Sequence, residues 1–404
     1  HVFAKQAAED SMVLLKNDTA VLPLDANDAV AVIGELAEKP RYQGGGSSHV
    51  NAYKLTTPLS VAQSSDYDVT YAQGYTLTDS AVNTQLADQA IELAKQADKV
   101  VVFAGVPEQL ESEGFDKESM DLPENQNNLI QQMTKVNKHV IVVLQNGSAV
   151  TMPWRDNVQA ILETYLAGEA VGEATWSVLT GEANPSGKLA ETFPEKIEDT
   201  PAFGTFNASP EAENYHEGIY VGYRYYDMKH KQVNFPFGHG LSYTTFEYSD
   251  LKITTENDRV NVTVKVTNTG AVAGKETVQV YVQNQASSVE TPVQELKAFK
   301  KVALEPKESQ LVTLNLNRRS FAWYDTANAN WRVDNGHYCI QVGASSRDIR
   351  LSQVIDVKLG TDKPTTISED TYLNQVIGRE DLKSALKQSG LDVVLDNVAS
   401  GSDS

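Results

Sequence analysis

Residues 99–105 read KVVVFAG, a continuous apolar run bounded by Lys and Gly. It lacks the alternation of polar and apolar residues that a half-exposed strand shows. A run of this kind predicts a strand of a parallel sheet that is covered by helices on both faces. Comparable runs occur at residues 29–34, 139–144 and 158–163. The four runs together predict a mostly parallel sheet.

Segments with helical spacing of apolar residues separate these strands. They are residues 4–15, 79–97, 124–136 and 171–179. Strands that alternate with helices predict a three-layer α/β/α sandwich, here over residues 1–214. Such folds carry their chemistry on loops at the carboxyl ends of the strands. In this chain those loops would follow Gly34, Gly105, Leu144 and Tyr165.

The pattern changes to a period of two from about residue 246. Residues 259–266 read RVNVTVKV, and the same alternation returns at residues 277–282, 310–316 and 337–342. Short alternating strands separated by turns predict an antiparallel β-sandwich of immunoglobulin or fibronectin type III type over residues 246–360. The full prediction is a multidomain α/β plus all-β chain.

Two further segments complete the predicted organisation. Residues 215–245 form a linker rich in aromatic residues and Gly, and we expect its aromatic side chains to bind the two domains together. Arg224 in this linker is expected to pair with a carboxylate. The tail, residues 361–404, has one amphipathic stretch at 373–386 and ends in a polar run predicted to be disordered.

Composition narrows the classes of function. The chain has 404 residues, which favours at least two domains. Its net charge of −20, from 34 basic and 54 acidic residues, argues against a nucleic-acid partner because phosphates would be repelled. No apolar run approaches the ~20 residues that cross a bilayer, so no membrane partner is expected. Self-association into a homo-oligomer is left open.

The cysteine and histidine residues predict no metal or disulfide. Cys339 is the single cysteine, so neither an internal disulfide nor a cysteine-based zinc site is possible, and its place in an alternating strand predicts a core position. The seven histidines show no metal-binding spacing, and no cofactor is expected. The chain begins at His1 without a visible signal sequence, and the lone cysteine favours the cytoplasm.

An acidic loop, LESEGFDK at residues 110–117, directly follows the central strand. It holds three carboxylates within six residues: Glu111, Glu113 and Asp116. A Glu at the carboxyl end of a sheet can act as a general acid where its surroundings raise its pKa. Taken alone, the loop fits a solvated surface turn better than a catalytic site.

Eight segments together resemble one family, in order along the chain. They are AEDSMVLLKN (8–17), LPL (22–24), GGGS (44–47), ESEGFD (111–116), LPENQ (122–126), GEANPSGKL (181–189), EGIYVGYRYY (217–226) and FPFGHGLSYT (235–244). This set resembles family 3 glycoside hydrolases of the β-glucosidase branch. The resemblance implies hydrolysis of terminal β-D-glucosyl residues of a β-glucoside or oligosaccharide, with β-xylosidase and exo-glucanase activity as related specificities.

The resemblance also implies a division of labour between domains. The family has a (β/α)8 barrel, then an α/β sandwich, then a fibronectin-like domain, and this chain resembles the last two. The barrel, which carries the nucleophilic Asp, is therefore expected upstream of His1, and the chain alone is expected to be incomplete and inactive. The alternative is a non-catalytic carbohydrate-binding or assembly module.

By resemblance, Glu113 occupies the acid/base position of the family. Glu111 is the rival candidate from the residues alone, and Asp116 is expected to brace the loop. The family more often has Arg where Lys117 stands, so we expect the supporting ion pair to be made differently here.

The glycine-rich loop is the expected substrate-binding segment. By resemblance, Gly45, Gly46 and Ser47 face the sugar cleft, although a plain turn fits each of them equally. The loop lacks the spacing of a phosphate-binding loop. Trp154 and Tyr165 could stack on a sugar ring, but isolated aromatic residues of this kind are expected in the core.

Overall fold

A six-stranded sheet forms the centre of the first half of the chain. Its order is β1-β6-β5-β4-β2-β3; β1 is antiparallel to β6 and the other neighbours are parallel. The strands are β1 Val13–Asn17, β2 Ala29–Ile33, β3 Asp68–Ala72, β4 Lys99–Gly105, β5 Val140–Gln145 and β6 Ala160–Glu163. The computed structural model describes residues 1–256, 258–285, 287–326, 328–360, 383–384 and 387–388.

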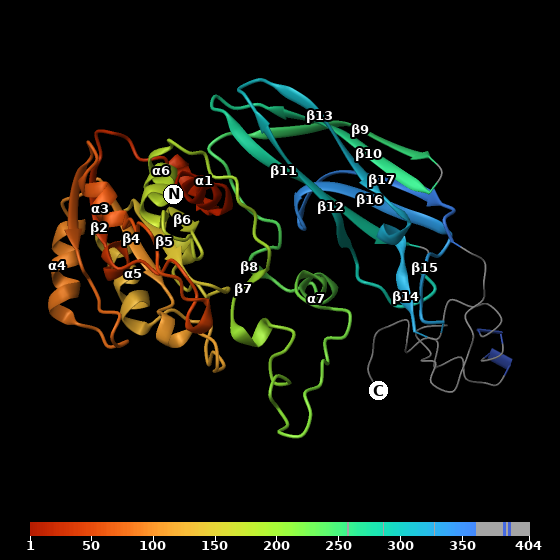
Figure 1. The fold of residues 1–404 in the computed structure, drawn as a ribbon, viewed down its shortest axis with the longest axis horizontal. Helices are drawn as coiled ribbons and strands as arrows, with labels where there is room; N and C mark the ends of the chain where they lie inside the picture. The colour runs from red at the N-terminus through yellow and green to blue at the C-terminus, as the bar shows by residue number, and fades with distance from the viewer. Residues whose placement is uncertain (257, 286, 327, 361–382, 385–386, 389–404) are drawn as a thin grey trace.

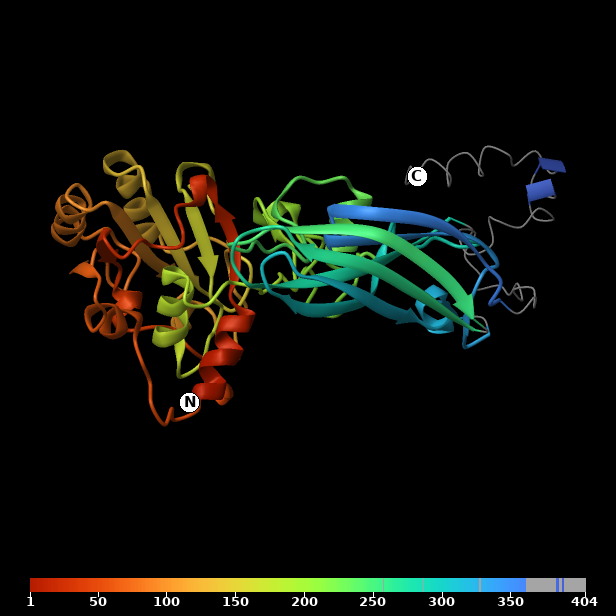
Figure 2. The same ribbon diagram turned by 90° about the horizontal axis from the view of Figure 1, so that it is seen from above.

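Helices cover both faces of this sheet, which confirms the predicted three-layer sandwich (Figures 1 and 2). They are α1 Val2–Ser11, α2 Glu35–Glu38, α3 Pro58–Gln63, α4 Thr84–Ala94, α5 Glu124–Val136 and α6 Val171–Thr180. Helices α1, α3 and α6 pack together, as do α4 and α5. The connection through α3 runs from β2 outward to β3, and the connections through α4 and α5 run the other way, to β4 and then β5. Crossovers of the usual right-handed form therefore put α3 on one face and α4 and α5 on the other.

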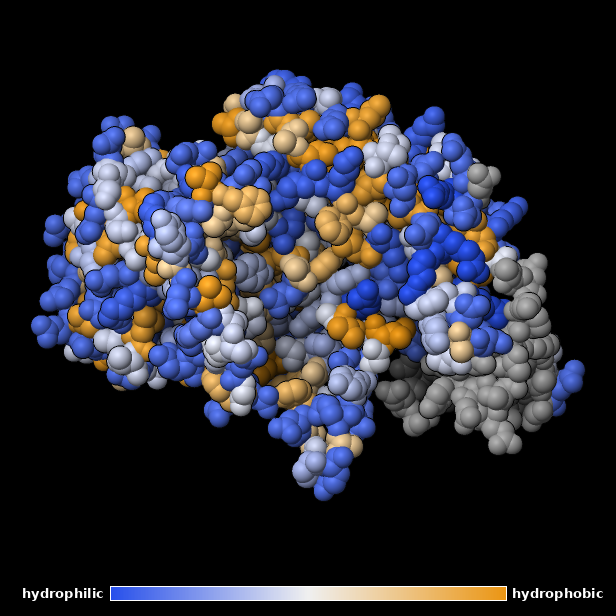
Figure 3. Space-filling view, in the orientation of Figure 1, coloured by the Kyte–Doolittle hydropathy of each residue, from blue (hydrophilic) through white to orange (hydrophobic). Residues whose placement is uncertain are grey.

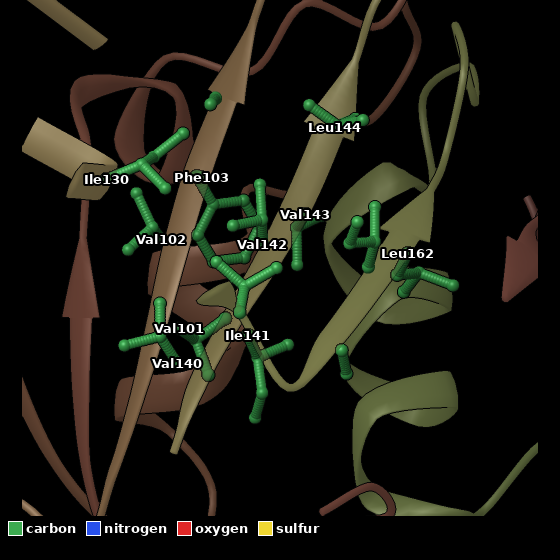
Figure 4. Packing of buried hydrophobic residues seen from close by; sticks show 14 of the residues in the cluster. Val101, Val102, Phe103, Ile130, Val140, Ile141, Val142, Val143, Leu144 and Leu162 are labelled. Carbon is green, nitrogen blue, oxygen red and sulfur yellow. The ribbon is translucent and has the colours of Figure 1, made fainter. Parts of the chain in front are cut away.

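The central strands are buried as the continuous apolar runs predict. Val101, Phe103, Ile141, Val142 and Val143 have no exposed surface, and Figure 4 shows the side chains of β4 and β5 interleaved. Residues on both faces of a strand are apolar because helices cover each face.

The first strand differs from the prediction. The helix expected over residues 4–15 ends at Ser11, and Val13–Asn17 forms β1 instead. Val13, Leu14 and Leu15 are all buried. A short apolar run satisfies a doubly covered strand as well as one face of a helix, so periodicity alone cannot separate the two.

Strand β3 was not predicted, because its sequence is partly polar. Strand β3 lies at the edge of the sheet and pairs only with β2. Its residues, DVTYA, alternate between exposed and partly buried positions before the buried Ala72. An edge strand needs no continuous apolar run, since part of it faces solvent.

The second half is the predicted β-sandwich of two antiparallel sheets. Their orders are β13-β10-β9 and β12-β11-β16-β17. The strands are β9 Phe246–Glu256, β10 Arg259–Asn268, β11 Gly274–Asn284, β12 Glu295–Leu304, β13 Ser309–Leu316, β16 Gly336–Ser345 and β17 Asp348–Val357. A hairpin of β14 Trp323–Asp325 and β15 Asn330–Arg332 lies beside them. Cys339 is buried in β16, as expected.

The aromatic linker joins the two halves. It contains helix α7 Tyr223–Met228 and strand β8 Val233–Phe235, which pairs with β7 Phe193–Pro194 from the preceding part of the chain. Figure 1 shows α7 and the β7–β8 pair between the two halves. The Tyr223 ring stacks on Phe237 with 4.5 Å between ring centroids. Arg224 pairs with Glu295 of β12 at 3.2 Å. The first contact lies within the linker itself. The Arg224 pair joins the linker to the β-sandwich, and Phe235 of the linker belongs to the core of the α/β sandwich, in agreement with the expected role of the linker.

The beginning of the chain also contacts the β-sandwich. The Nζ of Lys275 lies 2.5 Å from the Asp10 carboxylate, and Lys301 donates to the Asp10 carbonyl at 3.0 Å. Leu241 donates its amide to the Leu14 carbonyl at 2.8 Å. Helix α1 and strand β1 thus connect the α/β sandwich, the linker and the β-sandwich.

The visible surface carries no large apolar area. Figure 3 shows hydrophobic side chains in small groups scattered among hydrophilic ones. This mixture is usual for a folded protein surface. No helix within the described part of the chain is long and apolar enough to span a membrane. The predicted stretch at residues 373–386 falls largely outside the described residues.

The buried sheet predicts a stability effect. Phe103→Ala should lower the free energy of unfolding by about 3–5 kcal/mol, because the fully buried ring leaves a cavity between the strand and its covering helices. Urea denaturation followed by tryptophan fluorescence measures it. Tyr53→Ala is the control, since Tyr53 is 92% exposed. Equal effects of the two substitutions would contradict this account of the core.

Candidate active site

The acidic loop leaves the carboxyl end of β4 at the edge of the sheet, as expected. A short 3-10 turn, Glu108–Leu110, follows the strand, and Glu111 comes directly after it. The neighbouring strand β5 ends at Gln145, and its own loop continues through Gly147 and Ser148. The two loops meet at the Glu111 side chain.

Glu111 is held by donors from three segments. Its Oε2 accepts from the Gly147 amide at 2.8 Å and from the Nη1 of Arg41, with which it forms an ion pair. Its Oε1 accepts from the Ser148 hydroxyl and lies 3.5 Å from Lys117 Nζ. Arg41 also donates to the main-chain carbonyl of Glu111 at 2.8 Å. Both carboxylate oxygens are therefore occupied within the chain.

These contacts keep Glu111 ionised. Burial alone would raise the pKa of Glu111, but hydrogen bonds from Ser148, Gly147 and Arg41, with the charge of Lys117, outweigh it and lower the pKa. A carboxylate that is held ionised and has no free oxygen is poorly suited to donate a proton. The geometry thus separates Glu111 from its neighbour Glu113.

Glu113 lies exposed at the tip of the loop. Its carboxylate accepts a hydrogen bond from the Ser47 amide at 2.7 Å. Hydrogen bonding from the Ser47 side chain and amide lowers the pKa of Glu113. The carboxylate therefore faces open space and is held by the glycine-rich loop, which places Glu113, Gly45, Gly46 and Ser47 together.

The glycines of that loop let the two loops approach closely. Gly46 has φ +73°, and a Cβ atom there would lie 2.9 Å from Glu113 Oε2. A Cβ on Gly45 would lie 2.4 Å from Oγ of Ser112. Contact with the acidic loop is thus sufficient to explain glycine at both positions, whether or not a sugar also approaches them.

Bracing of the loop falls to Lys117 rather than Asp116. Asp116 is exposed and makes no hydrogen bond or ion pair with any residue that the structure describes. Lys117, in contrast, reaches Glu111 and lies 3.2 Å from the Ser148 hydroxyl. The bracing contact expected of Asp116 is therefore not found among the described residues.

A buried carboxylate supports the site from behind. Glu163, the last residue of β6, has no exposed surface and accepts from Asn146 Nδ2 at 2.9 Å. Asn146 also donates to the Ser148 carbonyl at 2.9 Å. Burial raises the pKa of Glu163 well above its usual value. In the sequence, Glu163 could have been singled out because it is a carboxylate directly at the end of an apolar strand.

The aromatic candidates belong to the core. Trp154 is fully buried and donates its indole N–H to Asn127 Oδ1 at 2.8 Å. Tyr165 is partly buried against the hydrophobic core, and burial raises the pKa of its hydroxyl. Neither ring is an open platform for a sugar. Among the described residues, no group of three or more His, Cys, Asp or Glu side chains could hold a metal ion.

Comparison with known protein families agrees with the fold of both halves of the chain. Residues 12–243 match the glycosyl hydrolase family 3 C-terminal domain, which is more than half of the chain. The chain belongs to glycoside hydrolase family 3. Residues 276–346 match the fibronectin type III-like domain, within the β-sandwich.

Individual relatives point the same way. The chain is 48% identical to the thermostable β-glucosidase B of Acetivibrio thermocellus over 88% of this chain and 48% of that protein. It is 43% identical to an exo-α-(1→6)-L-arabinopyranosidase of Bifidobacterium breve over 90% of this chain and 49% of that protein. The chain spans about half the length of these relatives.

A solved structure extends the likeness to three dimensions. The family 3 β-glucosidase of Bifidobacterium adolescentis superposes with a TM-score of 0.87 at 42% identity, covering 94% of this chain and 57% of that one. The chain is thus a hydrolase-family member whose fold matches a large part of a known β-glucosidase.

The close approach at Gly46 predicts a change in the titration of Glu113. Gly46→Ala should raise the pKa of Glu113 towards its ordinary value, because the new Cβ displaces the carboxylate from the Ser47 amide. Titration of the side-chain carboxyl carbon by NMR measures it. Gly44→Ala is the matched control, since a Cβ there meets only the Ser48 side chain. An unchanged pKa in Gly46→Ala would contradict the argument.

Proposed function

We propose that this chain supplies the general acid/base of a retaining β-glucosidase, and that Glu113 is that residue. The observation that carries the proposal is the exposed carboxylate of Glu113 at the carboxyl edge of the sheet, fixed by Ser47 and open on its other side. Membership of the family and the β-glucosidases among its relatives support the reaction class. The nucleophilic Asp would come from a barrel domain outside this chain.

The reaction has two steps in this proposal. In the first, Glu113 gives its proton to the glycosidic oxygen while the bond from that oxygen to C1 breaks, and the barrel Asp forms an ester with C1. In the second, Glu113 takes a proton from water as the water oxygen attacks C1, and the Asp leaves as a carboxylate. The two carboxyl groups of a retaining enzyme lie about 5–5.5 Å apart.

The environment of Glu113 in this chain favours only the second step. Its pKa is lowered by Ser47, and its carboxylate is exposed, so it is ionised at neutral pH. A general acid needs a raised pKa. Cover by a barrel would remove water from Glu113 and bring a second carboxylate close, and both changes raise a pKa. Assembly would therefore prepare the acid form.

The choice of Glu113 over Glu111 follows from the contacts. Both oxygens of Glu111 are taken by Arg41, Gly147 and Ser148, whereas Glu113 has the single partner Ser47 among the described residues. Only a carboxylate with a free oxygen can reach a substrate. The relatives define the sugar specificity less closely than the reaction class, because they include an arabinopyranosidase beside the β-glucosidases.

Removal of the Glu113 carboxylate tests the proposal. In the chain joined to its barrel-containing part, Glu113→Ala should lower kcat for an unactivated β-glucoside by roughly 10²–10⁴-fold. Azide should restore turnover of an aryl glucoside with an activated leaving group, because the azide anion attacks C1 of the glycosyl-enzyme in place of water, displaces the Asp carboxylate and needs no general base. Steady-state assays of both substrates measure these effects.

Glu118→Gln is the matched control for this substitution. Glu118 is exposed in the same loop, and its loss should leave turnover unchanged. Unchanged turnover in Glu113→Ala would overturn the assignment. Sugar binding without hydrolysis in the complete protein would favour the alternative of a binding module.

The pKa argument gives a separate prediction. Carboxyl-carbon NMR should place the pKa of Glu113 below its ordinary value in this chain alone and above it after a barrel-containing part is joined. The chain alone should show no measurable hydrolysis of aryl β-glucosides. Robust hydrolysis by the chain alone, or a Glu113 pKa that does not rise on assembly, would contradict the split of the catalytic pair.

A further inference from the structure

We propose that Glu111 is a positioning residue, which anchors both ends of the loop that carries Glu113 and so sets where that carboxylate lies. The inference rests on the proposed role of Glu113, but it concerns different residues and has its own test. Its basis is the network of Glu111, Arg41, Gly147, Ser148 and Lys117, which we call the loop anchor.

The loop anchor is tied to the rigid sheet. Arg41 donates its amide to Gln145 Oε1 at 2.9 Å and its Nη1 to the Val106 carbonyl at 2.8 Å. Gln145 ends β5, and Val106 follows β4 directly. The Arg41 side chain is 6% exposed. The guanidinium therefore has a fixed place relative to two neighbouring strands, and Glu111 binds to it there.

The anchor closes the loop on itself. Glu111 stands at the start of the segment and Lys117 near its end, and their side chains lie 3.5 Å apart. The Ser148 hydroxyl contacts both, donating to Glu111 and accepting from Lys117 Nζ at 3.2 Å. Residues 112–116 thus form a short bridge whose two ends meet at one point.

Among the described residues, the hydrogen bonds to the bridge itself are fewer than those of the anchor. Gly114 has φ +88° and no atom within 4 Å of the place where a Cβ would be. Phe115 is 51% exposed, and Asp116 is exposed without a partner among the described residues. The tip is held by the single bond from Ser47 to Glu113. Loss of the anchor would leave the carboxylate with one weak, solvent-exposed constraint.

The choice of a carboxylate at position 111 follows from the donors around it. Arg41, Gly147, Ser148 and Lys117 all present N–H or O–H groups to the same side chain. Only an ionised carboxylate accepts from all of them, whereas an amide would turn its NH₂ group towards a donor. Glu111→Gln therefore keeps the shape of the side chain and removes one side of the anchor.

The expected result in the barrel-containing protein is a loss of turnover without a loss of binding. Glu111→Gln should lower kcat for an unactivated β-glucoside by roughly tenfold to a hundredfold, because a displaced acid is less effective. KM should stay within about twofold. Glu295→Gln is the matched control: Glu295 is another partly buried carboxylate that pairs with an Arg and a Lys, Arg224 and Lys297, far along the chain in β12. It should leave kcat unchanged.

A double-mutant cycle decides whether Glu111 acts through Glu113. If it does, Glu111→Gln should have an effect below about twofold in the Glu113→Gln background, since there is no carboxylate left to position. A full additional loss in that background would overturn the proposal. If Glu113→Gln alone retains full activity, the proposed function fails instead, and the two failures are distinguishable.

A readout independent of activity comes from this chain alone. The Ser47 amide proton, which is bonded to Glu113, should shift in the NMR spectrum of Glu111→Gln and stay in place in Glu295→Gln. If Glu111→Gln does not fold, Ser148→Ala carries the test, because it removes one donor and leaves Arg41 in place. A Ser47 signal that is unmoved in the folded variant would overturn the proposal.

Discussion

The ion pair between Arg41 and Glu111 is the contact on which the acidic loop depends. Parallel strands end with their polar groups at one edge of the sheet, so loops that follow β4 and β5 are brought together there. A loop is nevertheless the least rigid part of a fold. Glu111 pairs with Arg41, and Arg41 bonds to Gln145 and Val106 at the ends of two strands. The position of Glu111 is therefore fixed relative to the sheet, although Glu111 lies in a loop.

The glycine-rich loop complements this arrangement from the opposite side. The anchor fixes the base of the acidic loop, and Ser47 fixes its tip. Gly46 makes the approach possible because it has no side chain and accepts a positive φ. A motif that by resemblance faces the sugar therefore also holds the Glu113 carboxylate. The same hydrogen bond keeps Glu113 ionised until another surface covers it.

Much of the fold followed from the sequence, and the exceptions have physical causes. The run at residues 99–105 indicated a strand covered on both faces, because the side chains on both of its faces are apolar. Helix α5 has the bounds that were predicted for it. Strand β1 was taken for the end of a helix, since three consecutive buried residues fit either structure. Strand β3 was missed because an edge position tolerates polar residues.

Within the site, Glu113 was indicated by its motif, but the partners of Glu111 were not. Arg41 is 70 residues away in the sequence, and only the strand order brings it near.

The contacts of Asp10 and Leu14 hold the start of the chain against the β-sandwich and the linker. The covalent connection between the sandwiches is the linker alone, and a single tether would let them swing. Because Asp10 of α1 also bonds to Lys275 and Lys301, the β-sandwich is held at a second point besides the linker. Two points of attachment restrict hinge motion between the halves, so the edge of the sheet that carries the acidic loop keeps a fixed orientation relative to the β-sandwich.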